Sequence, residues 1–359
     1  MVSNKKYFPT LKTTVAEMRC LKNLSESVKD GITPVFELTK SRKTKNDKDG
    51  DVYKRIKEVV EIFGDRNFVL DITNEDTLSN PQIESFFDDF SNWVDFIKEI
   101  SEVYSCNVIP TILLFEDSTK DEILELYHAL KVVSGSGKVC LKIDMPSFYN
   151  NSNSETLGYL LEISSEMKDD IIIINTGFID SNNSGEMYAK LKNCQDVLHR
   201  MSNDNNSIVF TVSTFPKSML ESASREKEFE NQDHKKFGKV SFKSWMVYEA
   251  IRRSFSFIHY GDYACIHPHR NEAKAYKWVP RIDYPLADKI FYYRTGAGYA
   301  ACAKEILNNF KEIKGDDIDC WGRDEVFSAA NGAPRGLSPS YWISVRSNIH
   351  VTRMSNLVI

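Results

Sequence analysis

The sequence predicts a single α/β domain of the (β/α)₈ TIM-barrel type, followed by a C-terminal extension. Eight short strand-like runs alternate with helical segments along most of the 359 residues, which is the rhythm of parallel strands joined by crossover helices. Residues 171–174 are all isoleucine, as expected for a strand that is covered on both faces. The glycine loop of a doubly wound sheet is missing, because no third glycine follows Gly296 and Gly298 at the required spacing.

Strands are expected where apolar residues gather in short runs bounded by polar residues or glycine. Residues 7–12 open the fold, and the eight predicted strands are 32–39, 67–73, 108–115, 138–144, 170–176, 207–213, 255–260 and 287–294. This arrangement predicts a barrel over residues 1–310 and an extension over residues 311–359 that packs on it.

Between the strands, apolar residues recur at the three- and four-residue spacing of helices. The clearest case is residues 52–63, where Val52, Ile56 and Val59 share one stripe. Thr119 followed by Glu122 has the spacing of a capped helix start. The predicted helices are 16–24, 52–63, 81–103, 119–133, 154–167, 186–201, 244–253 and 300–310.

Composition narrows the functional classes. The net charge of -5 argues against coating nucleic acid through bulk charge, so nucleic acid is not an expected partner. Seven widely scattered cysteines favour reduced thiols over a disulfide framework. Neither a signal peptide nor a run of about 18 apolar residues is present, so the chain is expected to be cytoplasmic and to lack membrane contact.

Ionisable residues stand at the carboxyl ends of several predicted strands, where barrel proteins place their chemistry. The group consists of Glu37, Asp71, Lys142, Asp144 and Arg294. Charged groups inside apolar strands cost several kcal/mol each unless they are paired or bind something. Two interpretations remain open at this point, namely a ligand-binding or catalytic mouth and a purely structural network of ion pairs.

A catalytic mouth would suit metal-assisted hydrolysis of a phosphate ester or nucleotide. Asp144 or Asp262 would then serve as the base, and Lys142 with Arg294 would stabilise developing charge. A binding mouth would take up a small phosphate-bearing ligand instead. The expected ligand contacts are Glu37, Asp71, Arg294, Tyr260 and Tyr263.

The sequence does not identify a metal or a cofactor. Glu37, Asp71, Asp144 and Glu116 carry the hard oxygen ligands that Mg²⁺ or Ca²⁺ prefers, but they form no spacing motif. His267 and His269 lack a third ligand nearby, and surface residues are the favoured interpretation. The loop over residues 263–284 is rich in aromatic and basic side chains, for which packing over the barrel mouth is favoured over base stacking.

Several segments together resemble the Beta protein family of phage, prophage and bacterial proteins. They are the opening YFPTLK at residues 7–12, VKDGITPVFE at residues 28–37, the turn YGDY at residues 260–263, the Trp321-Gly322 pair, and Trp342 with Asn348-Ile349-His350. The charged stretches 41–51 and 222–239 depart from the pattern without touching these motifs.

The resemblance implies a barrel-like fold and a mobile-element or anti-phage context. Together with the absence of a recognisable catalytic motif, it favours a role in phage defence or toxin neutralisation through binding of a partner or ligand at the barrel mouth. It also implies a protein partner encoded by a neighbouring gene, and it implies no catalytic residues. Among the polar residues at strand ends, Glu37 and Asp262 lie inside matching segments and therefore carry more weight than the others.

Overall fold

The computed structural model describes residues 6–45, 47–114, 118–151, 154–201, 206–225, 233–269 and 278–358. Its main feature is an eight-stranded sheet in the order β4-β3-β2-β1-β9-β7-β6-β5, in which all neighbours are parallel. The strands are β1 Tyr7–Lys12, β2 Val35–Leu38, β3 Phe68–Ile72, β4 Val108–Pro110, β5 Cys140–Asp144, β6 Ile171–Phe178, β7 Ser207–Ser213 and β9 His259–Asp262.

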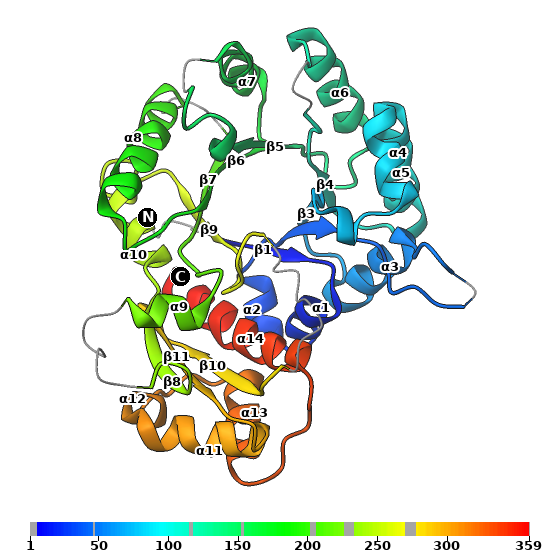
Figure 1. The fold of residues 1–359 in the computed structure, drawn as a ribbon. Helices are drawn as coiled ribbons and strands as arrows, with labels where there is room; N and C mark the ends of the chain where they lie inside the picture. Colours follow the sequence, from blue (N-terminus) through cyan, green and yellow to red (C-terminus); the bar gives the residue numbers. More distant parts are fainter. Residues whose placement is uncertain are drawn as a thin grey trace.

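The two edges of this sheet meet, so that it forms a barrel. A parallel bridge joins Thr111, just after β4, to Cys140 of β5, and Ile112 N donates to Cys140 O over 2.8 Å. Figure 1 shows the strands as a ring with helices around its outside. The (β/α)₈ barrel predicted from the sequence is therefore confirmed.

The helices of the barrel begin and end much as the apolar periodicity predicts. They are α1 Val15–Lys22, α2 Glu26–Asp30, α3 Val52–Phe63, α4 Pro81–Asp88, α5 Phe90–Tyr104, α6 Lys120–Val133, α7 Glu155–Glu166, α8 Ser184–Arg200, α9 Met219–Ser224 and α10 Ser244–Arg252. The expected cap of α6 is present, since Thr119 and Glu122 form a capping box. The helix expected over residues 81–103 is divided at Asp89, whose side chain accepts from Ser91 N and caps α5.

A second, smaller sheet lies beside the barrel. Its order is β10-β11-β8, all antiparallel, with β8 Phe237–Ser241, β10 Arg281–Pro285 and β11 Lys289–Arg294. One face packs against α11 Tyr299–Asn309, α12 Lys311–Lys314 and α13 Trp321–Ala330 in a core of its own. The other face, which includes Ile290 and Tyr292, packs against α9.

This second sheet corrects the predicted eighth strand. Residues 287–294 do form a strand, but β11 pairs with β10 through a tight connection in which Leu286 N donates to Lys289 O. An antiparallel partner three residues away is closed more easily than a distant parallel one. The place in the barrel is taken by β1, the segment that the sequence marks only as the opening of the fold.

The C-terminal helix α14 Pro339–Val358 joins the two parts. Its N-terminal part, up to Ile349, contributes Trp342, Val345 and Ile349 to the smaller core. Its second half contributes Val351 and Met354 to the core between barrel and helices, beside α1. A helix that buries residues all round lies inside a protein, and α14 fills the place of the helix that follows the last barrel strand (Figure 1). The expected boundary at residue 310 stays a prediction.

Candidate functional site

The barrel interior has an apolar layer, and a polar layer follows it toward the carboxyl ends of the strands. The apolar layer consists of Phe8, Val35, Val69, Ile109, Cys140, Ile171, Ile173 and Val209. The same face carries Glu37 and Asp71 two residues beyond Val35 and Val69, and Lys12 four residues beyond Phe8. Lys12, Glu37 and Asp71 are neighbours in register. On the opposite wall, Asp144 stands in register with Asn175 of β6.

These side chains form alternating ion pairs at the carboxyl ends of the strands. Lys12 binds Glu37 and lies 3.3 Å from Glu75. The Nζ atom of Lys142 lies 2.8 Å from Asp71 Oδ2 and 3.7 Å from Asp144 Oδ2. The structure thus brings together Glu37, Asp71, Lys142 and Asp144 of the five residues expected at the mouth. Lys142 pairs with both aspartates, and Glu37 pairs with Lys12.

Burial and neighbouring charge act against each other in this network. Burial lowers the pKa of Lys142, but Asp144, Asp71 and Glu37 outweigh it, and the net pKa lies well above the usual value. Burial raises the pKa of Asp71, and Lys142 only partly reverses that rise. Burial also raises the pKa of Glu37, but Lys12 and Lys142 bring it below its usual value. The pKa values of Glu37 and Asp71, two carboxyl groups of one network, are therefore shifted in opposite directions.

Asp144 is the most accessible carboxylate of the network. Its side chain is 47% exposed, and its Oδ1 accepts from Asn175 Nδ2 over 2.5 Å. The hydroxyl of Tyr263 donates to Asn175 Oδ1 over 3.0 Å, which places Tyr263 at the mouth. Burial raises the pKa of that hydroxyl. Glu116 lies outside the described residues.

Sequence reasoning missed Lys12, which contributes the second cation of the mouth. The signal was available, since Lys12 ends an apolar run as Glu37 does. The pattern of the run 7–12 marks the opening of the fold and does not identify it as a barrel strand. The Nζ atom of Lys12 also donates to Pro268 O over 3.2 Å, so that Lys12 ties the loop after β9 to the mouth.

Asp262 and Tyr260 do not lie at the mouth, which corrects their expected position. Between them, Gly261 faces the barrel interior, where an added Cβ would lie 2.3 Å from Thr211 Oγ1. The side chains on either side of it therefore point outward. Both are buried, at 1% and 0% exposure, between β9 and the surrounding helices.

Asp262 holds three distant segments together. Its Oδ1 accepts from Tyr7 OH over 2.6 Å and from Ala264 N over 2.8 Å. Its Oδ2 accepts from Tyr260 OH over 2.7 Å and from His350 Nε2 over 2.6 Å. With four donors around it and no open side, Asp262 is placed as an anchor for β1, α14 and the loop after β9.

The pKa of Asp262 reflects the same surroundings. Burial alone would raise the pKa, but the His350 side chain and the hydroxyls of Tyr7 and Tyr260 outweigh burial and bring it below the usual value. The ionised carboxylate is therefore the form that the fold stabilises.

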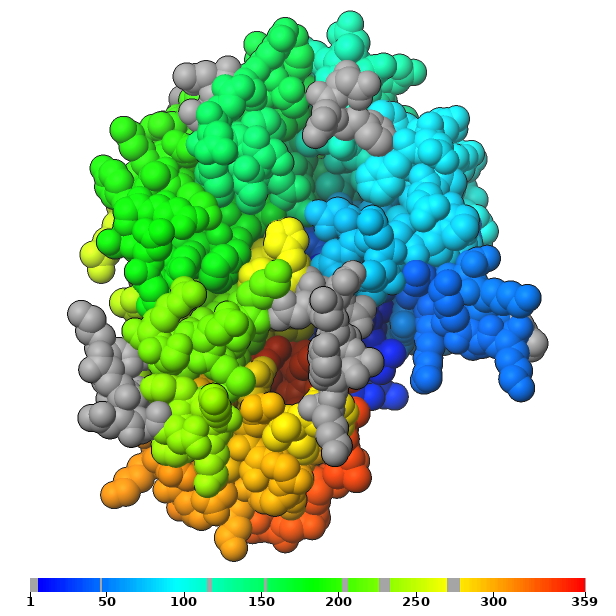
Figure 2. Space-filling view, in the orientation of Figure 1, coloured from blue at the N-terminus to red at the C-terminus, as the bar shows by residue number. Residues whose placement is uncertain are grey.

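Arg294 also lies outside the barrel interior, because it ends β11 of the second sheet. It does line a groove of about 1110 Å³ that begins at Lys12 and extends to β10, β11 and α14. In Figure 2 this hollow lies between the barrel and the second sheet, with part of α14 in red at its bottom. The loops after β1, β7 and β9 form its barrel side.

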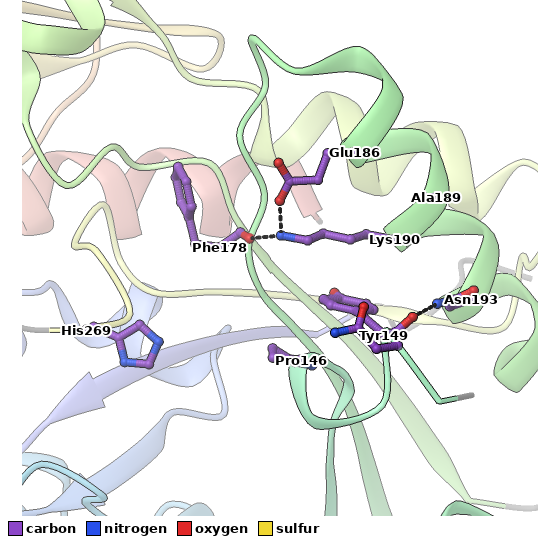
Figure 3. A pocket seen from close by; sticks show the side chains of 9 residues that line it. Pro146, Tyr149, Phe178, Glu186, Ala189, Lys190, Asn193 and His269 are labelled. Carbon is purple, nitrogen blue, oxygen red and sulfur yellow. Dashed lines mark hydrogen bonds and ion pairs between the residues drawn. The ribbon is translucent and has the colours of Figure 1, made fainter. Parts of the chain in front are cut away.

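A second, smaller cavity of about 460 Å³ lies beside the loops after β5 and β6. Figure 3 shows Lys190 paired with Glu186, one turn earlier on the same helix α8, at 2.6 Å, and reaching to the carbonyl of Phe178 at 3.4 Å. His269 lies on its far side and also lines the larger groove.

Across the ranges that the structure describes, no group of three or more His, Cys, Asp or Glu could hold a metal ion. No helix of that part is long and apolar enough to cross a membrane.

Comparison with known proteins gives a consistent assignment. A family model described as Beta protein matches residues 7–356. The chain is 25% identical to Protein beta of Enterobacteria phage P4 over 362 residues, which covers 99% of this chain and 94% of that protein. Among solved structures, the spore cortex-lytic enzyme SleL of Bacillus megaterium is similar at a TM-score of 0.36 and 9% identity, covering 96% of this chain and 74% of that one. That last likeness is too distant to bear on function.

Proposed function

The chain belongs to the Beta protein family, and from this premise we propose that it is a binding protein whose groove takes up a small anionic ligand. The observation that carries the proposal is the charge of the groove. Its lining includes Lys12, Lys217, Arg281, Arg294 and Arg346 against Glu17, Glu221 and Asp283. Because Lys12 is already paired with Glu37 at the mouth, four cationic side chains remain against three carboxylates. The whole chain has the opposite balance, with a net charge of -5. A local surplus of positive charge on an acidic protein favours an anion at that place.

The composition of the groove agrees with a small-molecule site. Aromatic side chains stand beside the cations, and pockets for small ligands combine apolar walls with a few placed polar groups. His267 and His269 also line the groove. Burial lowers the pKa of His267, so we expect the site to bind through its lysines and arginines at neutral pH.

Hydrolysis assisted by a metal receives less support from the mouth. Glu37 and Asp71 would have to turn toward an ion, but each already binds a lysine. Separating a buried pair leaves a carboxylate without its partner, which costs about 3–5 kcal/mol. The binding function requires no such rearrangement.

Titration calorimetry with inorganic tripolyphosphate at low salt tests the proposal. Binding is expected, and Arg294→Glu is expected to weaken it by about tenfold, since one lost charge contact is worth on the order of 1–2 kcal/mol. The matched control is Arg252→Glu on α10, a partly exposed arginine that is paired with Glu249 at 3.1 Å and does not line the groove. Absence of binding by the wild-type protein, or equal loss in both variants, would refute the proposal.

The biological part of the proposal is a role in phage defence or toxin neutralisation. Its support is family membership and the similarity to Protein beta of a phage. We expect deletion of the gene to change the sensitivity of the host to phage infection, and we expect the product of a neighbouring gene to co-purify with this chain. Unchanged infection together with a chain that purifies alone would count against that role.

A further inference from the structure

The second sheet places two arginines directly opposite each other. Arg281 of β10 is the register partner of Arg294 of β11, and like charges in that position destabilise a sheet. Asp283 relieves part of the repulsion, since Arg281 approaches its two oxygens at 2.8 and 3.0 Å. The same carboxylate also binds Arg346 Nη1 over 2.5 Å. Two guanidinium groups, those of Arg281 and Arg346, thus share this carboxylate. Arg294 donates to Lys235 O instead, so three arginines stand against one carboxylate and the cluster retains a charge of about +2.

Arg346 has donor capacity that the described residues leave unused. It comes from α14, is 4% exposed and lines the groove. Its guanidinium lies 4.5 Å from the centre of the Phe215 ring. Its Nε atom has no hydrogen-bond partner within the described part of the chain. Buried donors of this kind are normally satisfied, and a phosphate accepts from several arginine N–H groups at once.

An aromatic stack stands at the same groove. The Trp278 ring lies 5.9 Å from Tyr299, and Tyr299 lies 5.1 Å from Trp342 with a 22° angle between their planes. Tyr299 and Trp342 are 3% and 4% exposed, and Trp342 Nε1 donates to Gly336 O over 3.0 Å, so the inner part of the stack is fixed. Trp278 is the outer member and is 52% exposed.

The stack and the arginines are close enough to contact one ligand. Trp278 precedes Arg281 by three residues, which limits their separation along the chain to about 11 Å. A nucleotide spans a comparable distance from its base to its phosphates. An exposed tryptophan that is supported from behind offers a flat surface on which any nucleobase stacks.

We propose that the ligand of the groove is a nucleotide, whose base stacks on Trp278 and whose phosphates bind the cluster of Arg281, Arg294 and Arg346. The inference deepens the proposed function and rests on it. A single nucleotide is favoured over a nucleic acid strand, because the net charge of -5 disfavours a long polyanion outside the groove.

The experiment separates the base from the phosphates. Titration calorimetry is run with ATP, GTP, CTP and UTP and with inorganic tripolyphosphate, which carries a similar charge without a base. At least one nucleotide is expected to bind about tenfold more tightly than tripolyphosphate, as one stacked base contributes. Trp278→Ala is expected to abolish this difference, and Trp278→Phe is expected to retain most of it.

The control variant is Tyr188→Ala on α8, an aromatic residue that is 71% exposed and does not line the groove. It is expected to bind nucleotides as the wild type does, and a urea unfolding curve shows that each variant is folded. If tripolyphosphate binds as tightly as every nucleotide, or if Trp278→Ala keeps the difference, the inference is overturned while the proposed function stands. If nothing binds, both fail. Tighter binding of a ten-residue oligothymidine than of UTP overturns the preference for a single nucleotide.

Discussion

Replacing Asp262 by alanine is expected to destabilise the protein by about 3–5 kcal/mol, because it removes a buried carboxylate that satisfies several buried donors. The carboxylate accepts four hydrogen bonds, from Tyr7, Tyr260, His350 and the backbone of Ala264, at 2.6 to 2.8 Å. Alanine leaves all four donors buried without an acceptor, and each such donor costs about 1–3 kcal/mol before the structure relaxes. Relaxation keeps the total below the simple sum.

Urea unfolding followed by circular dichroism measures this loss. The matched control is Asp95→Ala in α5, an exposed aspartate, for which a change within about 0.5 kcal/mol is expected. Asp262→Asn keeps one acceptor oxygen and should cost less, about 1–3 kcal/mol, so it replaces alanine if that variant does not fold. Equal midpoints for wild type and Asp262→Ala would refute the anchor role of this side chain.

The stability lost in Asp262→Ala is expected to depend on pH. Because the folded pKa of Asp262 lies below its usual value, the carboxylate stabilises the protein at pH above about 4 and loses that effect as the pH falls through the folded pKa. The difference in unfolding free energy between wild type and Asp262→Ala should therefore be constant from pH 7 to 5 and shrink below pH 4. A difference that grows on acidification would contradict the assigned direction.

Two further substitutions test the packing of the barrel interior, and a labelling experiment tests the burial of the cysteines. Gly261→Ala should cost about 1–3 kcal/mol in urea unfolding, because its Cβ would lie 2.3 Å from Thr211 Oγ1 inside the barrel. Lys142→Met should cost about 3–5 kcal/mol at pH 7 by leaving Asp71 unpaired. Burial already raises the pKa of Asp71, so the unpaired carboxylate of the variant takes up a proton as the pH falls. The difference in unfolding free energy between wild type and Lys142→Met should therefore shrink as the pH falls from 7 toward 4. A thiol reagent should modify about one cysteine in the native protein, Cys320, because the other six are buried, and seven after denaturation.

Matched controls exist for the two substitutions. Gly158 of α7 has nothing within 4 Å of an added Cβ, so Gly158→Ala should stabilise the protein by about 0.5–1 kcal/mol. Lys57→Met on α3 removes a 64% exposed lysine and should change the unfolding free energy by less than about 0.5 kcal/mol. Rapid labelling of several native thiols, or a Gly261→Ala variant as stable as Gly158→Ala, would contradict the packing described.

Arg294 and Asp262 show why strand ends alone did not define the candidate site. Both follow an apolar run and look equivalent along the chain. Arg294 ends an antiparallel strand of the second sheet, and Asp262 ends a barrel strand with its side chain outward. The position of Arg294 depends on which strand pairs with β11. The direction of the Asp262 side chain depends on the alternation of side chains between the two faces of a strand, which a shift of one residue reverses.

The sequence by itself determined the alternation of strands and helices, the capped start of α6 and the charged ends of β2, β3 and β5. These features depend on residues within one or two turns of each other, where spacing and residue type are sufficient. Only the tertiary structure decided that Lys12 binds Glu37, that Lys142 binds Asp71, and that Asp262 meets His350. Those pairs lie 25, 71 and 88 residues apart, and their contacts follow from how the barrel closes and how α14 returns to it. A local sequence pattern cannot predict contacts between such distant residues, because these contacts depend on the packing of every element in between.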